Sequence, residues 1–201
     1  MKIKEMNRLT AHFDFYFGQK EPLILHPVVE APLHLDALLY EPNKPYPFWK
    51  LVTMGASDYK MPAIRPLFDR RNEYMLLIHP EVDLHDPAVA NKYYRLLCEV
   101  ALYPAMSKTA LTYGHSIEWQ PEEGEDTVGA YLELPQMIRG TGILRCKLGI
   151  GKRVTCLQVI PLNREEMDRC LEVGPQAFSY FLYPDQGEGY YVRRLNEKKD
   201  V

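Results

Sequence analysis

Two periodicities divide the chain into helical and strand-like segments. Between residues 3 and 17, apolar side chains recur every three or four positions and Gly18 follows as a C-terminal stop, which predicts an amphipathic opening helix. At Asp86 an N-cap candidate precedes a proline, and the segment that follows is apolar on one face as far as Pro104. The predicted helices cover residues 3–17, 86–104, 163–174 and 175–183.

Apolar runs bounded by Pro, Gly and Asn predict strands between these helices. The run RNEYMLLIH at residues 71–79 is strongly apolar at its centre, as expected of a central strand. Residues 149–151, Gly-Ile-Gly, predict a hairpin turn, and residues 140–142, Gly-Thr-Gly, are interpreted as another. The predicted strands are residues 34–40, 49–54, 71–79, 111–119, 127–134, 143–148, 154–160 and an edge strand at 190–195.

This order of elements predicts the fold class. Strands in runs with helices inserted, rather than strict alternation, indicate an α+β fold with a mixed or largely antiparallel sheet packed by a few helices. A chain of 201 residues, 46% hydrophobic and 25% charged, can bury a core without disulfides or metals. We expect one domain over residues 1–201 with a polar tail at 196–201, and reduced cysteines, because none of the four forms a Cys-x-x-Cys pair.

Charge and hydropathy narrow the class of partner. The formal charge of −3 provides no overall basic field for nucleic acid. The first residues contain no apolar core of signal-peptide length, and no apolar run is long enough to cross a bilayer. A cytoplasmic protein is therefore expected, with no membrane and no nucleic-acid partner.

Chemically suggestive clusters are few. Residues 55–59, Gly-Ala-Ser-Asp-Tyr, match a nucleophile elbow at three positions, but a tyrosine stands where the elbow requires glycine. His79 and His85, together with His34 and Asp36, offer imidazoles and carboxylates that could gather a metal, although their spacing fits no named site. Hydrogen-bonded histidines at strand ends are the commoner outcome. The sequence therefore predicts no catalytic residue, no cofactor and no metal ligand.

An acidic cluster precedes the predicted strand at 127–134. Such a cluster is usually a solvated loop, but it can also steer a basic protein partner. Both interpretations remain open. Its members are Glu118, Glu122, Glu123, Glu125 and Asp126.

Several ordered blocks resemble the suppressor-of-fused domain family. They are HLDALLYEP, PFWKLVTMGASDYKMP with its Thr53-x-Gly55-x-Ser57 corner, RNEYMLLIHP, and VIPLNREEMDRCLEVGPQAF. The segments KYYRLLCEVALYP and YGHSIE are also similar to the family's central helix and the segment after it. The resemblance spans residues 34–183. It departs at Ala56, where the family commonly has methionine.

The resemblance implies a binding module without known catalysis, and bacterial members are proposed to be immunity proteins that neutralise a cognate toxin. The role that the animal regulator's second domain has in clamping a transcription-factor peptide is not expected here. We therefore expect a protein partner, with the acidic cluster and Gly55, Ser57 and Asp58 as candidate contacts. The alternatives are a metal- or small-molecule-dependent enzyme using His34, Asp36, His79 and His85, and a scaffold that presents an edge strand to peptides.

Overall fold

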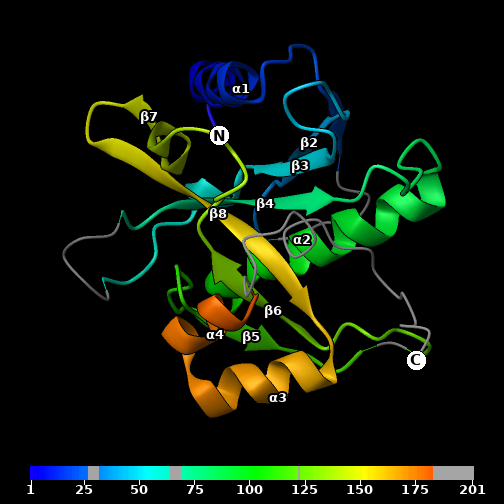
Figure 1. Cartoon of the computed structure of the whole chain (residues 1–201). Helices are drawn as coiled ribbons and strands as arrows, with labels where there is room; N and C mark the ends of the chain where they lie inside the picture. Colours follow the sequence, from blue (N-terminus) through cyan, green and yellow to red (C-terminus); the bar gives the residue numbers. More distant parts are fainter. Residues whose placement is uncertain (27–31, 64–68, 122, 183–201) are drawn as a thin grey trace.

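The computed structural model describes residues 1–26, 32–63, 69–121 and 123–182. Eight strands form one mixed sheet in the order β1-β2-β3-β4-β8-β6-β5, and β7 pairs with β8 outside this path (Figure 1). The strands are β1 Leu23–Leu25, β2 Asp36–Tyr40, β3 Trp49–Met54, β4 Asn72–Ile78, β5 Ser116–Glu118, β6 Gly129–Glu133, β7 Arg145–Gly149 and β8 Lys152–Leu162. The helices are α1 Ile3–Phe17, α2 Pro87–Ser107, α3 Arg164–Val173 and α4 Pro175–Leu182, with 3₁₀ turns at Ala56–Asp58 and Thr141–Leu144.

The centre of the sheet is its one parallel pair, β4 with β8. Antiparallel ladders extend outward from it, through β3, β2 and β1 on one side and through β6 and β5 on the other. A parallel pair requires a long crossover, and here the crossover contains α2, β5, β6 and β7. The predicted α+β fold with a mixed sheet is confirmed, as is the central position of the strand at 71–79.

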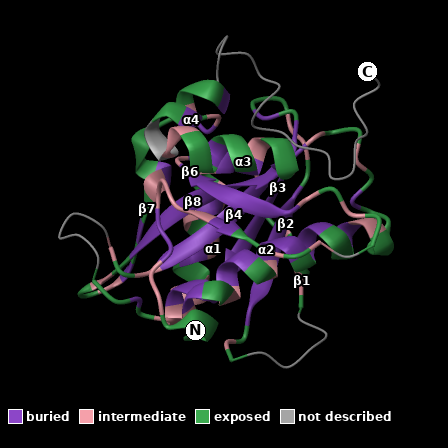
Figure 2. Ribbon diagram, turned by 90° about the horizontal axis from the view of Figure 1, so that it is seen from below, coloured by how far each residue is buried: buried purple, intermediate pink, exposed green. Residues whose placement is uncertain are grey.

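The inner strands are buried on both faces, so they are apolar almost throughout rather than alternating. On β3, Leu51 faces a cluster that includes Leu97 of α2. The next residue, Val52, faces the other cluster, which includes Phe13 of α1. Figure 2 shows the consequence: the inner strands β2, β3, β4 and β6 are buried, and the helices expose their outward faces.

A third cluster fixes α3 and α4 against the far part of the sheet. Phe178 of α4 packs its ring edge-to-face on Tyr131 of β6, with 5.3 Å between the ring centroids. The Ser179 hydroxyl donates a hydrogen bond of 2.6 Å to Glu133, which is fully buried. Burial raises the pKa of Glu133, and its hydrogen bonds offset only part of that rise. The helix pair thus closes the end of the sheet opposite β1.

The helix ends follow the local signals in the sequence. Gly18 caps α1 in the left-handed region at φ 63°. The Asp86 carboxylate accepts a 2.8 Å hydrogen bond from the Ala88 amide at the start of α2. Asn163 and Glu166 form a reciprocal capping box at the start of α3.

Two predicted boundaries were wrong. Helix α2 does not stop at Pro104 but continues to Ser107, where Lys108 adopts a left-handed conformation at φ 51°. Pro104 is buried, so packing retains a residue that would normally end the helix. The predicted strand 111–119 is reduced to β5, because the carbonyl of Leu111 accepts a 2.6 Å hydrogen bond from Asn72 and is held there ahead of a turn.

The Gly140–Gly142 segment is not a hairpin turn. Gly140 precedes the 3₁₀ turn Thr141–Leu144, which leads into β7. Residues 149–151 do connect the hairpin of β7 and β8, as predicted. All four cysteines are free. The predicted edge strand at 190–195, the tail at 196–201 and Glu122 lie outside the described residues.

Candidate functional site

Residues 53–58, here called the Gly55 corner, end β3 and turn the chain sharply into the 3₁₀ turn Ala56–Asp58. Gly55 has φ 133°, a value that side chains other than hydrogen rarely allow. A Cβ atom at this position would lie 2.3 Å from the carbonyl oxygen of His34. The corner therefore requires glycine both for its backbone conformation and for its close approach to the segment that leads into β2.

The buried side chain of Glu73, on β4, holds the Gly55 corner in place through hydrogen bonds. One carboxylate oxygen accepts hydrogen bonds of 3.1 Å from the amides of Gly55 and Ser57, and the other accepts a 2.6 Å bond from the Thr53 hydroxyl. Thr53 in turn accepts a 2.8 Å bond from the amide of Tyr74. The Thr-x-Gly-x-Ser spacing thus places three donors around one acid.

Glu73 is fully buried. Burial raises the pKa of its carboxyl, and the hydrogen bonds of the corner lower it without cancelling that rise. A group so enclosed cannot reach a substrate, so we assign it a structural role. Sequence analysis overlooked Glu73, although the signal was present as the one carboxylate in the apolar run 71–79.

The corner presents little of itself to a partner. Gly55 and Ser57 are buried, and Asp58 is partly exposed. The complete burial of Ser57 also excludes a nucleophile elbow, which must expose its serine. Any direct contact by these three predicted residues falls to Asp58.

Asp58 belongs to a small charged network. It pairs with the N-terminal amine and, at 3.1 Å, with Lys152, which also lies 2.9 Å from Glu5. Partial burial would raise the pKa of Asp58, but the hydrogen bonds from these two cations outweigh it and lower the pKa. The network connects α1, the corner and the start of β8.

The acidic cluster is divided among different environments. Glu118 is exposed and pairs with Arg164 of α3 at 2.7 Å. Glu125 lines a small surface pocket beside Arg95 of α2. Glu123 and Asp126 are exposed. A role for these residues in partner binding stays a prediction.

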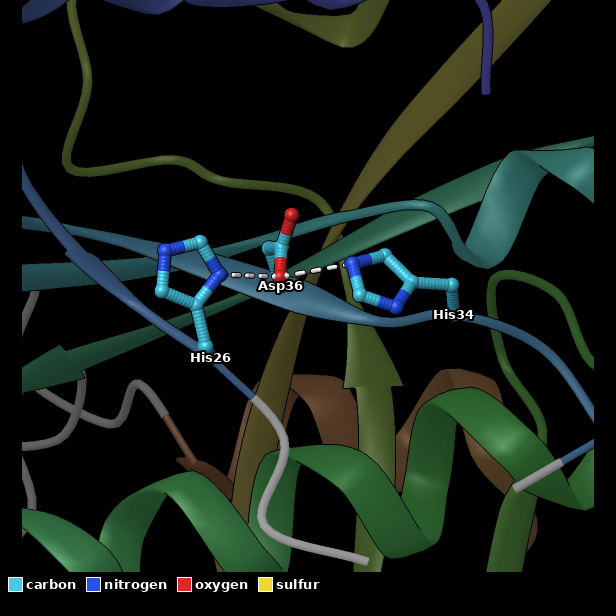
Figure 3. Close-up of side chains that lie close together, drawn as sticks. All are labelled: His26, His34 and Asp36. Carbon is cyan, nitrogen blue, oxygen red and sulfur yellow. Dashed lines mark hydrogen bonds and ion pairs between the residues drawn. The ribbon is translucent and has the colours of Figure 1, made fainter. Parts of the chain in front are cut away.

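Two of the four residues in the alternative metal set come together, and they are joined by a histidine that the sequence analysis did not include. His26 Nδ1 lies 2.9 Å from Asp36 Oδ1, and His34 Nε2 lies 3.1 Å from the same oxygen (Figure 3). Within the described ranges, this is the one group of three His, Cys, Asp or Glu residues placed to hold a metal ion. His26 follows β1, a short strand that is absent from the predicted strands.

His79 and His85 do not join this group, so the four residues of the alternative set do not all come together. Asp36 of β2 pairs with Met54 of β3, and the register of β3 with β4 places Met54 beside Glu73. His79 follows Glu73 by six residues, which is about 20 Å along a strand. The two histidines instead lie 3.8 Å from Glu81 and Glu41, respectively.

Solved structures of the same fold come from animals and bacteria. A suppressor-of-fused homologue from Neisseria gonorrhoeae FA 1090 aligns with a TM-score of 0.68 at 12% identity, covering 96% of each chain. The Sufu chain of a Sufu–Fu complex aligns with a TM-score of 0.66 at 14% identity, covering 96% of this chain and 91% of that one. Drosophila Suppressor of Fused gives 0.66 at 15% identity, with 94% of this chain but only 49% of that one.

A comparison with curated proteins finds no match to the chain, whereas a family profile does match it. None of the helices in the described segments is both long and apolar enough to cross a membrane. The sequence profile of the suppressor-of-fused protein family, however, matches residues 31–189, and this match covers most of the molecule, so the chain belongs to the suppressor-of-fused family.

Proposed function

We propose that this chain is a non-catalytic protein-binding domain that acts in the cytoplasm as an immunity protein against a cognate toxin. The observation that carries the proposal is the family assignment, together with a solved family member, Sufu, in complex with its protein partner Fu. The internal character of the Gly55 corner supports it, because Ser57 and Glu73 are fully buried there and serve the scaffold.

Electrostatics supply the expected recognition surface. The net charge is −3, and the described members of the acidic cluster are Glu118, Glu123, Glu125 and Asp126. Complementary charge accelerates association with a basic partner, from about 10⁵–10⁶ M⁻¹s⁻¹ for neutral surfaces toward 10⁸ M⁻¹s⁻¹ at low salt. A toxin with a basic face is the partner that such a cluster would attract.

The test begins with capture of the tagged full chain from its native lysate at low salt, followed by native mass spectrometry. The captured partner is then expressed alone and with the chain. We expect a stoichiometric complex with a protein that arrests growth when expressed alone and is harmless in the presence of the chain. A partner that is harmless by itself would overturn the toxin-neutralising role and leave protein binding intact.

A charge-reversal pair tests the surface. Glu123→Lys with Glu125→Lys should slow association about tenfold at low salt and flatten its salt dependence. The matched control reverses Glu41 and Glu81, two exposed acids outside the cluster. Equal association rates for both double variants would place the binding surface elsewhere.

A further inference from the structure

We propose that His26, His34 and Asp36 form a binding site for one divalent transition-metal ion, with Zn²⁺ the best-matched ion. The site is independent of the proposed partner surface. It lies where β1 and β2 pair, on the face of β2 opposite α2 (Figure 3).

Strand geometry brings the three side chains together. In the antiparallel pair, Leu25 lies opposite Ala37, so the next residue, His26, faces Asp36 across the ladder. His34 is two residues before Asp36 and shares its face, because side chains alternate along an extended chain. The site therefore combines one cross-strand neighbour with one neighbour on the same strand.

The distances suit a tetrahedral ion. The three ligand atoms lie within 4.8 Å of one another. The imidazole nitrogens of His26 and His34 lie 2.9 and 3.1 Å, respectively, from Asp36 Oδ1. Bonds of about 2.0–2.1 Å at a tetrahedral angle separate ligand atoms by about 3.3–3.4 Å. The two imidazole–carboxylate distances therefore need to lengthen by only a few tenths of an ångström, and the two imidazole nitrogens, which lie within 4.8 Å of each other, need to approach to a similar spacing.

The ligand types select the class of ion. Two imidazoles and one carboxylate favour zinc, copper or nickel over magnesium and calcium, which prefer oxygen ligands. Without a metal, both rings must direct N–H groups at one carboxylate oxygen. An ion would replace both protons and supply the charge that a buried carboxylate needs.

The surroundings hold the ligands and leave a way in. Asp36 is 2% exposed, whereas both histidine side chains are 69% exposed. The backbone beside the site is fixed, since Gly55 abuts the His34 carbonyl and the Tyr94 hydroxyl donates a 2.7 Å hydrogen bond to Leu35. The carboxylate is therefore anchored, and the fourth coordination position faces solvent.

Calorimetry on the full chain provides the test. Protein stripped with a chelator is titrated with ZnCl₂, and we expect saturable binding of one ion per chain. His26→Ala and His34→Ala should each weaken that binding about tenfold or more, because loss of even an outer-sphere partner costs 10- to 100-fold. The control, His79→Ala with His85→Ala, removes two histidines outside the site and should bind as the wild type does.

Cobalt and thermal unfolding give readouts that do not depend on activity. Co²⁺ should produce the visible absorption of a tetrahedral N/O site in the wild type and not in either single variant. Zn²⁺ should raise the melting temperature of the wild type and the control alone. Absence of saturable zinc binding would overturn the proposal, as would unchanged binding in folded His26→Ala and His34→Ala proteins; the three residues would then be a hydrogen-bonded cluster only.

Discussion

Replacing Glu73 tests whether one buried acid holds the Gly55 corner. In Glu73→Ala, the amides of Gly55 and Ser57 lose their acceptor in a site without solvent. Each buried donor left unsatisfied costs about 1–3 kcal/mol, so the two together cost about 2–6 kcal/mol. A domain is stable by only about 5–15 kcal/mol. We therefore expect Glu73→Ala to lose a large part of its free energy of unfolding in urea denaturation.

Glu73→Gln separates the hydrogen bonds from the charge. The glutamine carbonyl can take the place of the oxygen that accepts both amides, and Thr53 can rotate its hydroxyl to accept from the new NH₂ group. We expect Glu73→Gln to be much closer to the wild type than Glu73→Ala is. Urea unfolding of both variants at one pH measures the difference.

The pH dependence gives the sign of the electrostatic effect. Because burial raises the pKa of Glu73 above its ordinary value of 4.5, the folded chain holds this proton more tightly than the unfolded chain. Its stabilising contribution is complete below the unfolded pKa and is lost as the pH rises through the folded pKa. The stability of the wild type relative to Glu73→Gln should therefore fall as the pH increases from below 4.5.

One outcome would refute this reasoning. If the wild type instead gained stability over Glu73→Gln with rising pH, the three donors of the corner would be holding an ionised carboxylate with a lowered pKa. Glu81→Gln, which removes an exposed acid, is the control and should show little pH-dependent difference from the wild type.

Two further substitutions test the backbone and the core by urea unfolding. Gly55→Ala drives a Cβ atom against the His34 carbonyl and should cost about 3 kcal/mol or more, whereas Gly151→Ala, also at positive φ but with no atom within 4 Å, should cost about 1 kcal/mol. Equal losses would refute the steric argument. Leu97→Ala empties a fully buried position and should cost about 2–5 kcal/mol; Met106→Ala, at an exposed position of the same helix, should change stability by less than about 0.5 kcal/mol.

Local signals predicted most elements, because helix caps and glycine stops act within a few residues of themselves. Gly18, Asp86 and Asn163 behave as their sequence neighbours indicate. The errors arose where tertiary packing overrides local preference. Pro104 remains inside α2, and Leu111 is held by Asn72 of β4, a residue distant in sequence.

The candidate metal site was only half predictable for the same reason. His34 and Asp36 share a strand face, which a two-residue spacing reveals. His26 joins them only through the register of β1 with β2, and a three-residue strand after a proline gives little periodic signal. His79 and His85 were added because His and Asp crowd together in residues 79–86. That crowding does not show which end of the sheet these residues reach.

The Gly55 corner also explains how the departure at Ala56 acts. Glu73 holds the amides on either side of Ala56, so its side chain direction is set from within the domain. Ala56 is 5% exposed and belongs to the core cluster that α2 covers. A methionine there would add volume to that core rather than to the surface. We therefore expect the departure to act on the packing between α2 and the sheet rather than on an exposed contact surface.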